Sequence, residues 1–437
     1  MHQPRFLKRA VVAVGFLVIA GLVLWRGFLA SGRRVASFPN GRQLIIRQST
    51  YGTEHQFITG NALAKVVAPA LPDSLKGKIG VRTFTEKTER PTVVVWGEWR
   101  LGKDTSPTAA SVSQMLRIKR QGSQDARNVV VWWGRHYGAY LALPLNNFPR
   151  RDPILHLEIC EFDKGWRLKP VAEFSLPNPS PKNFPQWKAD PYPIVKRTGG
   201  LEFSMANFSA GQFVADPWLT VMRHLQLGTG YTAIFRVAEN SRALDNWEVK
   251  QLIVRDATGN IVKSRLQPSV QVGDYLVFGL GEVLWPSEQA WKFETEFTRT
   301  SGFTSNEVCS MEGISIPAFL GTATQVLASA KANGAELIGV ELQRMRPVPS
   351  LQRMREDLEI EPLLPRTLTN RIVSLAAVKD DQGRALNHDR SYFNLDGMHF
   401  GIELLPDSRA LDLTFAVQQP VVIEFLGGLS ESRANGR

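Results

Sequence analysis

Residues 291–298 read Trp-Lys-Phe-Glu-Thr-Glu-Phe-Thr, so apolar and polar side chains largely alternate along the stretch. Successive side chains of an extended strand point to opposite faces, which places the aromatic residues on one face and Glu294 and Glu296 on the other. This period of two predicts a β-strand with its aromatic face in a core and its glutamates toward solvent. Apolar, β-branched and aromatic runs at 93–96 and 129–133 have the same strand-like character. The predicted fold class is therefore mainly β.

Helical patterns are few and short, and they predict helices only at residues 61–67, 111–120, 322–332 and 350–358. The chain is 43% hydrophobic and 21% charged, which is typical of a globular protein and not of a disordered one. Its two cysteines, Cys160 and Cys309, are too few for a disulfide scaffold, an iron–sulfur cluster or a cysteine-rich zinc site.

Three stretches, Leu157–Trp166, Leu252–Asn260 and Ala376–Arg384, share one hairpin pattern, in which an apolar strand runs into an aspartate and a glycine follows two or three residues later. The second and third stretches continue in parallel along the chain. Aspartate bonds its own following backbone, and glycine supplies the positive φ of a tight turn. The aspartates, Asp256 and Asp380, are 124 residues apart, and proline and alanine positions further along repeat at an offset of 120. The pattern predicts an internal duplication. Common hairpin composition is the alternative explanation.

A Pro-rich stretch divides the β-rich sequence. Six prolines fall within residues 177–193, and proline can neither continue a helix nor donate in a central strand. An extended linker is therefore predicted there. The predicted domain plan is a basic tail at 1–9, a transmembrane helix at 10–30, a membrane-proximal β-rich domain at 36–176, a linker at 177–198, a β-sandwich at 199–310, its second copy at 314–428 and a frayed tail at 429–437.

The Asp-turn-Gly hairpins and aromatic strands resemble those of bacterial immunoglobulin-like and fibronectin III-like sandwiches. The resemblance implies tandem β-sandwich domains. It implies no role for any single residue, because the chain lacks the Cys–Trp–Cys spacing of antibody domains.

The formal net charge of +11 is concentrated near the N-terminus. Residues 1–50 contain eight basic and no acidic residues, whereas residues 51–437 contain 44 basic and 41 acidic residues. A high isoelectric point can indicate a nucleic-acid partner. Because the excess lies mostly in one short segment, the sequence argues against nucleic-acid binding.

The basic N-terminal segment surrounds an apolar stretch at residues 10–30 that is predicted to cross a lipid bilayer. About 20 helical residues span a hydrocarbon core of about 30 Å. The flanking side chains expected at the two interfaces are Arg5, Lys8, Arg9, Trp25, Arg26, Arg33 and Arg34. An uncleaved signal-anchor is favoured over a cleaved signal peptide, because the late cleavage site has Phe28 where a small residue is required. Positive charges on both sides leave the orientation open, and a short cytoplasmic tail with an exported body is favoured.

Sequence motifs for common catalytic sites, such as HExxH, GxSxG and the P-loop, are absent. No catalytic or cofactor-binding residue is therefore predicted. The densest group of titratable side chains comprises Asp380, Asp381, His388 and Asp389, near His399. Carboxylate and imidazole groups can bind a divalent cation such as Ca²⁺ or Zn²⁺, so these residues are candidate metal ligands. A solvated hairpin tip is the alternative. Glu294 and Glu296 could suggest glycosidase chemistry, but their alternation with aromatic residues favours an exposed face.

Together these features predict a single-pass, membrane-tethered bacterial envelope protein whose body lies outside the cytoplasm. Its β domains are expected to form a non-catalytic binding or structural module, with an envelope protein or a glycan as partner. The alternative is a glycan-acting envelope hydrolase whose active site is assembled from distant loops.

Overall fold

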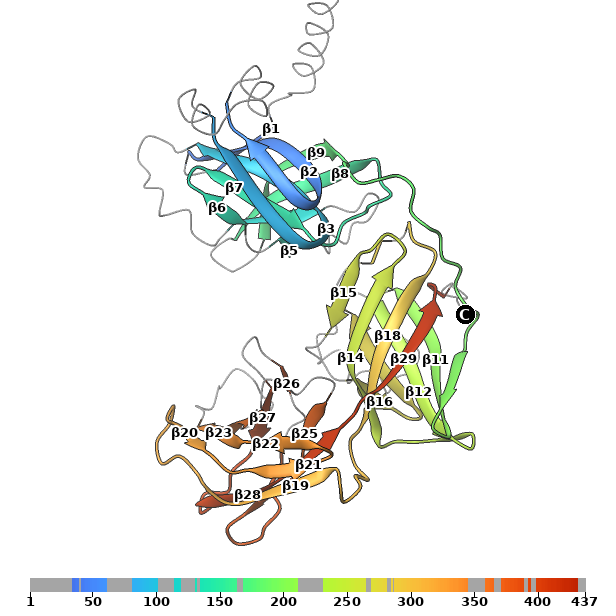
Figure 1. Cartoon of the computed structure of the whole chain (residues 1–437), viewed down its shortest axis with the longest axis vertical. Helices are drawn as coiled ribbons and strands as arrows, with labels where there is room; N and C mark the ends of the chain where they lie inside the picture. Colours follow the sequence, from blue (N-terminus) through green and yellow to red (C-terminus); the bar gives the residue numbers. More distant parts are fainter. Residues whose placement is uncertain are drawn as a thin grey trace, which may run out of the picture. The chain divides into compact units, whose positions relative to one another are not determined.

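The computed structural model describes residues 34–38, 41–60, 81–100, 114–118, 130–131, 134–162, 168–210, 231–264, 269–280, 284–285, 287–344, 358–364, 371–388, 392–393 and 398–430 (Figure 1). In these ranges the regular elements are β-strands and none is a helix, so the prediction of a mainly β chain is confirmed. The described part therefore contains no helix of the length and apolarity that a bilayer requires. The predicted anchor at residues 10–30 lies outside the described ranges, as do all its flanking residues except Arg34, whose backbone begins the first strand.

The chain divides into two compact units, residues 1–184 and residues 185–437. The described residues of unit 1 form two antiparallel sheets. The five-stranded sheet has the order β1 (Arg34–Ser37), β2 (Gln43–Ile58), β3 (Thr83–Arg100), β7 (Tyr140–Leu145) and β6 (Arg135–Tyr137). The four-stranded sheet has the order β5 (Val130–Val131), β4 (Gln114–Ile118), β8 (Ile154–Phe162) and β9 (Leu168–Pro177).

Where unit 2 is described, it forms two pairs of larger sheets, and the first pair is called here the first sandwich. One of its sheets has the order β10 (Ile194–Thr198), β11 (Leu201–Ala210), β12 (Tyr231–Glu239), β17 (Tyr275–Leu280) and β16 (Val270–Val272), with β13 (Arg242–Ala243) beside β12. The other has the order β15 (Ile261–Ser264), β14 (Trp247–Asp256), β18 (Trp291–Arg299) and β29 (Val421–Gly427).

One apolar core joins the two sheets of the first sandwich. Phe297 on β18 lies 4.9 Å from Phe203 on β11 and 5.8 Å from Phe235 on β12, measured between ring centroids. Residues 291, 293, 295 and 297 are buried, while Glu294 and Glu296 lie on the opposite, partly exposed face. The alternation predicted for this strand is confirmed.

The remaining large sheets are called here the second sandwich. One has the order β19 (Val308–Ser315), β28 (Ala410–Gln418) and β25 (Ile372–Asp380). The other has the order β20 (Ala323–Val326), β23 (Gly339–Arg344), β24 (Leu358–Leu363), β27 (Met398–Ile402) and β26 (Tyr392–Phe393), and a short hairpin joins β21 (Ala330–Ala332) to β22 (Ala335–Leu337). A second apolar core lies between the sheets.

The last of the described strands, β29, lies in the first sandwich. β29 pairs along its whole length with β18, from Trp291 opposite Gly427 to Phe297 opposite Val421 (Figure 1). The sequence repeat assigned residues 314–428 to one domain, but residues 421–427 complete the sheet of the preceding one. Phe425 on this strand joins the core of the first sandwich, 5.8 Å from Phe235, which is the physical reason for the placement.

Two predicted helices are wrong. Residues 322–332 contain strands β20 and β21, and residues 111–120 contain strand β4. In each case pairing with a distant strand decides the outcome: β20 pairs with β23, and β4 pairs with β8. Tertiary hydrogen bonding here overrides a weak local helical preference. The helix predicted at 61–67 lies outside the described ranges, and so does all of 350–358 except Leu358, the first residue of β24.

We predict that Phe297→Ala destabilises unit 2 by about 3–5 kcal/mol, because it opens a cavity between the two sheets of the first sandwich. Urea denaturation followed by circular dichroism measures the change. Phe319→Ala is the matched control, since the Phe319 side chain is 75% exposed. The control is expected to change the unfolding free energy by less than about 0.5 kcal/mol. Equal effects of the two substitutions would contradict the assignment of Phe297 to the core.

Candidate functional site

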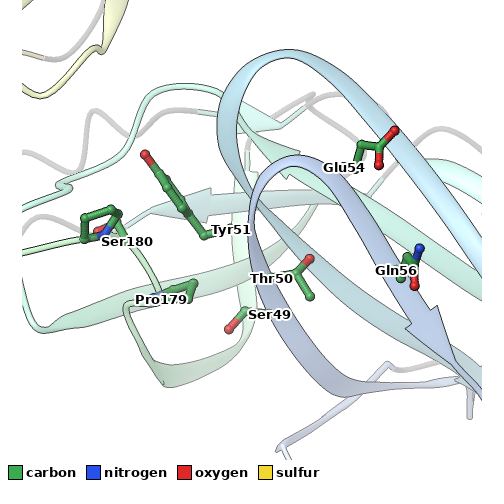
Figure 2. A pocket seen from close by; sticks show the side chains of 8 residues that line it. Ser49, Thr50, Tyr51, Glu54, Gln56, Pro179 and Ser180 are labelled. Atoms are coloured by element: carbon green, nitrogen blue, oxygen red, sulfur yellow. The ribbon is translucent and has the colours of Figure 1, made fainter. Parts of the chain in front are cut away.

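A polar groove of about 710 Å³ lies on unit 1, within the size range of small-molecule sites. Strand β2 contributes one wall, and the segment that follows β9 contributes the other (Figure 2). The groove is lined by Ser49, Thr50, Tyr51, Glu54, Gln56, Pro179, Ser180 and Pro181. Hydroxyl, amide and carboxylate groups thus surround one tyrosine ring and two prolines.

The β2 wall is shaped by a break in the pairing of β2 with β3. Gly52 pairs with Thr92 and Glu54 pairs with Lys87, so the residues between Lys87 and Thr92 form a bulge. Gly52 has a φ of +141°, a conformation that glycine adopts without steric cost. Bulges re-aim side chains and are common beside binding sites. Tyr51 and Glu54 lie on β2 on either side of this break in the pairing, and Figure 2 shows them apart along the groove.

The Tyr51 ring is held by a buried arginine. Arg150 is 4% exposed, and its Nη1 donates a hydrogen bond to the Tyr51 hydroxyl over 3.0 Å. Its Nη2 donates to the Pro91 carbonyl over 2.8 Å, and its guanidinium lies 4.8 Å from the centroid of the Phe148 ring. Because the arginine is fixed at both nitrogens, the tyrosine ring is preorganised in the groove.

The opposite wall is fixed by Asn178. Its Nδ2 donates to the carbonyls of Pro149 over 2.9 Å and of Asp152 over 2.7 Å, and its Oδ1 accepts from the Ser180 amide over 3.1 Å. The Ser180 hydroxyl donates to the Arg150 carbonyl over 2.7 Å. The start of the segment that the sequence predicts to be a linker is thus tied to unit 1, where it forms part of the groove.

A buried histidine lies beneath the groove wall. His55 is 0% exposed, its Nδ1 is 2.9 Å from the Thr50 hydroxyl, and its Nε2 is 3.4 Å from the Thr88 hydroxyl. Burial lowers the pKa of His55, and this effect outweighs the opposite influence of the Gly52 backbone and of Glu86. The ring is therefore neutral at neutral pH and positions Thr50, which lines the groove.

The groove carries one lining carboxylate, that of Glu54. Lys87 Nζ lies 2.8 Å from Glu54 Oε1, and both side chains are exposed at the rim. The hydrogen bond and charge of Lys87 lower the pKa of Glu54, which is therefore ionised at neutral pH and accepts hydrogen bonds.

None of these groove residues was predicted from the sequence. A glycine inside a strand pattern, as at Gly52, is the available signal, because it often marks a bulge or a close approach of another group. The second signal is Asn178 at the start of the Pro-rich stretch. An asparagine side chain favours a turn in which it bonds to the backbone two residues later, here at Ser180. Neither signal shows that the two segments meet.

Of the candidate metal ligands, Asp380 ends β25 and Asp381 begins the turn that follows. Oδ1 of Asp380 accepts from the backbone amides of Gln382 over 3.0 Å and of Arg384 over 2.8 Å, and its Oδ2 accepts from Arg384 Nε over 2.6 Å. Burial raises the pKa of Asp380, but these hydrogen bonds and the charge of Arg384 outweigh it and lower the pKa. Asp381 accepts a hydrogen bond from the Arg409 amide over 3.1 Å.

Of the other two candidate ligands, His388 is described and is not bonded to Asp380 or Asp381. His388 places Nε2 3.1 Å from the Leu375 carbonyl, and Asp389 lies outside the described residues. Among the residues that are described, no group of three or more histidine, cysteine or acidic side chains is arranged to hold a metal ion. The aspartate at 380 serves the turn itself, so the metal site stays a sequence prediction.

Glu294 and Glu296, the other carboxylates considered from the sequence, face away from the core of the first sandwich. Arg255 Nη1 lies 2.7 Å from Glu294 Oε2, and Gln251 Nε2 lies 3.4 Å from Glu296 Oε1. Both partners come from the neighbouring strand β14. These glutamates take part in cross-strand contacts on an outer sheet surface.

Comparisons with protein-family models, with curated protein sequences and with solved structures found no match to this chain. The interpretation of the groove therefore rests on its geometry and chemistry.

We predict that His55→Gln flattens the pH dependence of unit 1 stability between about pH 7 and pH 5. An unfolded histidine protonates near pH 6.5, whereas the lowered pKa keeps folded His55 neutral to lower pH. The unfolded state then binds more protons, so the free energy of unfolding of the parent falls as the pH falls through this window. Thermal melts at several pH values measure the slope, with His136→Gln, at an exposed position on β6, as the control. Equal slopes in the parent and His55→Gln would refute the role of His55.

Proposed function

We propose that the protein is a membrane-tethered binding module of the bacterial cell envelope and that the groove on unit 1 binds a glycan. The preorganised groove around Tyr51 carries the proposal. A sugar ring presents an apolar C–H face and a rim of hydroxyl groups. An aromatic ring provides a flat surface for the apolar face, while the oxygens of Ser49, Thr50 and Glu54 accept hydrogen bonds from the rim.

Preorganisation supports binding at this site. Arg150 holds the Tyr51 hydroxyl and Asn178 holds the Pro179–Pro181 wall, so a ligand does not have to order these groups when it binds. Affinity depends strongly on the conformational entropy that is lost on association. A groove whose aromatic ring and opposite wall are already fixed therefore favours ligand binding.

Binding is favoured over glycan hydrolysis by the carboxylates of the groove. Most glycosidases place two carboxyl groups about 5–10 Å apart across the scissile bond. The residues that line this groove include one carboxylate, Glu54, and its exposed ion pair with Lys87 lowers its pKa, whereas a general acid needs a raised one. The geometry supports recognition of hydroxyl groups.

The remaining parts of the proposal come from the sequence. The apolar stretch at residues 10–30 anchors the chain in the bilayer as an uncleaved single-pass helix, and the body lies outside the cytoplasm. The sandwiches of unit 2 are of the immunoglobulin-like or fibronectin III-like type and act as structural modules beside the glycan-binding unit. Their antiparallel sheets with apolar cores support this proposal.

We predict that Tyr51→Ala weakens binding of soluble peptidoglycan fragments or neutral polysaccharides by tenfold or more, about 1.4 kcal/mol. Tyr51→Phe keeps the ring but loses the bond to Arg150, so a smaller loss is expected. Tyr275→Ala, at an exposed tyrosine of unit 2, is the matched control and is expected to leave binding unchanged. Isothermal titration calorimetry measures the affinities. The glycan proposal fails if the parent binds none of these probes, or if Tyr51→Ala and the parent bind equally.

We predict that the full chain remains in the membrane fraction after a carbonate wash and leaves it only with detergent. The double substitution Leu17→Asp and Val18→Asp is expected to release it, because charged side chains at the centre of a bilayer are costly. Leu327→Asp, at a side chain that is 76% exposed, is the control and should stay in the membrane fraction. External protease added to spheroplasts should digest the body. Protection of the body, or release of the parent without detergent, would overturn the tethered, exported arrangement.

A further inference from the structure

The two sandwiches of unit 2 have one sheet with the same order of strands. In the first sandwich the order is β10-β11-β12-β17-β16, and in the second it is β20-β23-β24-β27-β26. All these neighbours are antiparallel in both sheets. Each strand of the first sheet therefore has a counterpart at the same place in the second.

The other sheets agree in register at both ends of the equivalent strand pair. Val249 lies opposite Phe297 in the pair β14–β18, and Val373 lies opposite Val417 in the pair β25–β28. The offsets are 124 residues on one strand and 120 on the other, the values found for the sequence repeat. The register of each pair shifts once, just after Val249 and just after Leu375. Equal offsets, and a bulge in the same strand pair of each copy at sites two residues apart, support two copies of one ancestral unit.

The hairpin turns after β14 and β25 also match. Asp256 Oδ1 accepts from the amides of Thr258 and Asn260, each over 2.9 Å, as Asp380 Oδ1 does from the amides two and four residues later. Glycines at equivalent positions, Gly259 and Gly383, have φ values of +96° and +75°. The turn thus has the same hydrogen bonds in both sandwiches.

The two copies differ in which part of the chain supplies one edge strand. The neighbour of β18 in the first sandwich is β29, which follows the whole second sandwich in the chain. The equivalent neighbour of β28 is β19, which follows directly after the first sandwich's own β18. Each copy is completed by the strand that comes after the other copy.

We propose that the two copies have exchanged these final strands, so that each sandwich closes only when the other is present. In the alternative arrangement without exchange, β18 would pair with β19 and β28 would pair with β29. Both connections are short, because residues 300–307 join β18 to β19 and residues 419–420 join β28 to β29. Connections of these lengths are common between antiparallel strands. The structure instead uses the long-range pairing, which inserts the second sandwich between two paired strands of the first.

Two groups of hydrogen bonds hold the exchanged arrangement. One joins the end of β28 to the end of β18, and the other lies at the far end of β29. Gln418 Nε2 donates to the Arg299 carbonyl over 2.9 Å, and the Arg299 amide donates back to Gln418 Oε1 over 3.0 Å. At the far end, the Asp190 amide donates to the Leu426 carbonyl over 2.8 Å, and the Tyr192 hydroxyl donates to the Gly428 carbonyl over 2.7 Å. The end of β29 and the residue after it are thus held by residues 190 and 192, which precede β10.

The consequence is that residues 185–430 behave as one cooperative unit. When the second sandwich is folded, it holds the start of β29 close to the end of β18. When it unfolds, the same two strands are joined by a long flexible loop, whose closure has an entropic cost. Loss of the second sandwich therefore loosens β29 and exposes the backbone of β18 as a sheet edge.

Four solvent-side positions distinguish the exchanged from the local arrangement. Glu294 lies opposite Glu424, and Ser310 lies opposite Thr414, with the Ser310 and Thr414 hydroxyl oxygens 3.3 Å apart. Positions 294 and 414 are equivalent in the two copies. Directly opposed residues have Cβ atoms about 4.5–5.5 Å apart, which is near the roughly 3.5–4.5 Å of a disulfide and within reach of a short cross-linker.

The test places cysteine pairs in the full chain in which Cys160 and Cys309 are replaced by alanine. The pairs Glu294→Cys with Glu424→Cys, and Ser310→Cys with Thr414→Cys, are expected to cross-link within one molecule. The matched control pairs, Thr414→Cys with Glu424→Cys and Glu294→Cys with Ser310→Cys, are expected to remain reduced. Peptide mass spectrometry identifies the linked residues. Linkage of the control pairs, or linkage of 294 to 424 only between two molecules, would overturn the exchange.

A second measurement tests cooperativity. Leu342→Ala creates a cavity in the core of the second sandwich. We expect amide hydrogen exchange to accelerate tenfold or more in β18 as well as in the second sandwich, and the 294–424 disulfide to restore protection to β18 alone. Leu320→Ala, at an exposed position, is the control and should change neither. Acceleration confined to the second sandwich would refute the coupling. Neither readout involves glycan binding, so this inference and the proposed function are tested separately.

Discussion

The backbone ladder between β18 and β29 is the interaction on which the architecture of unit 2 depends. It joins residues 291–297 to residues 421–427 and so brackets the whole second sandwich. β29 also delivers Phe425 and Ile423 to the core of the first sandwich, which combines directional hydrogen bonds with apolar burial. Because both effects act at β29, this strand stabilises the first sandwich, which otherwise consists of residues from much earlier in the sequence.

The groove on unit 1 also depends on contacts between segments that are far apart in the sequence. Its tyrosine is presented by a long strand, but the ring is fixed by Arg150, about a hundred residues later. Its second wall is fixed by Asn178, which bonds to the turn that contains that arginine. A site built from side chains this far apart in the sequence is rigid only because several hydrogen bonds act on each part of it.

Local sequence patterns predicted a large share of the fold. Alternation at residues 291–298 predicted both the strand and its buried face, and the Asp-turn-Gly pattern predicted the hairpins after β14 and β25. These features depend on nearest neighbours along the chain, which the sequence displays directly. The predicted helix at 322–332 was wrong for the converse reason, because pairing of β20 with β23 is invisible in the sequence of either strand.

The sequence by itself determined the β class, the apolar and polar faces of individual strands, the duplicated turn and the acid-free, apolar segment near the N-terminus. These properties follow from side-chain periodicity and from the conformational preferences of glycine, proline and aspartate. Only the tertiary structure decided that β29 lies beside β18, and that Tyr51 lies across a groove from Pro179. Pairing between distant segments depends on which free edges and apolar surfaces match in space, and a one-dimensional pattern contains no such distances.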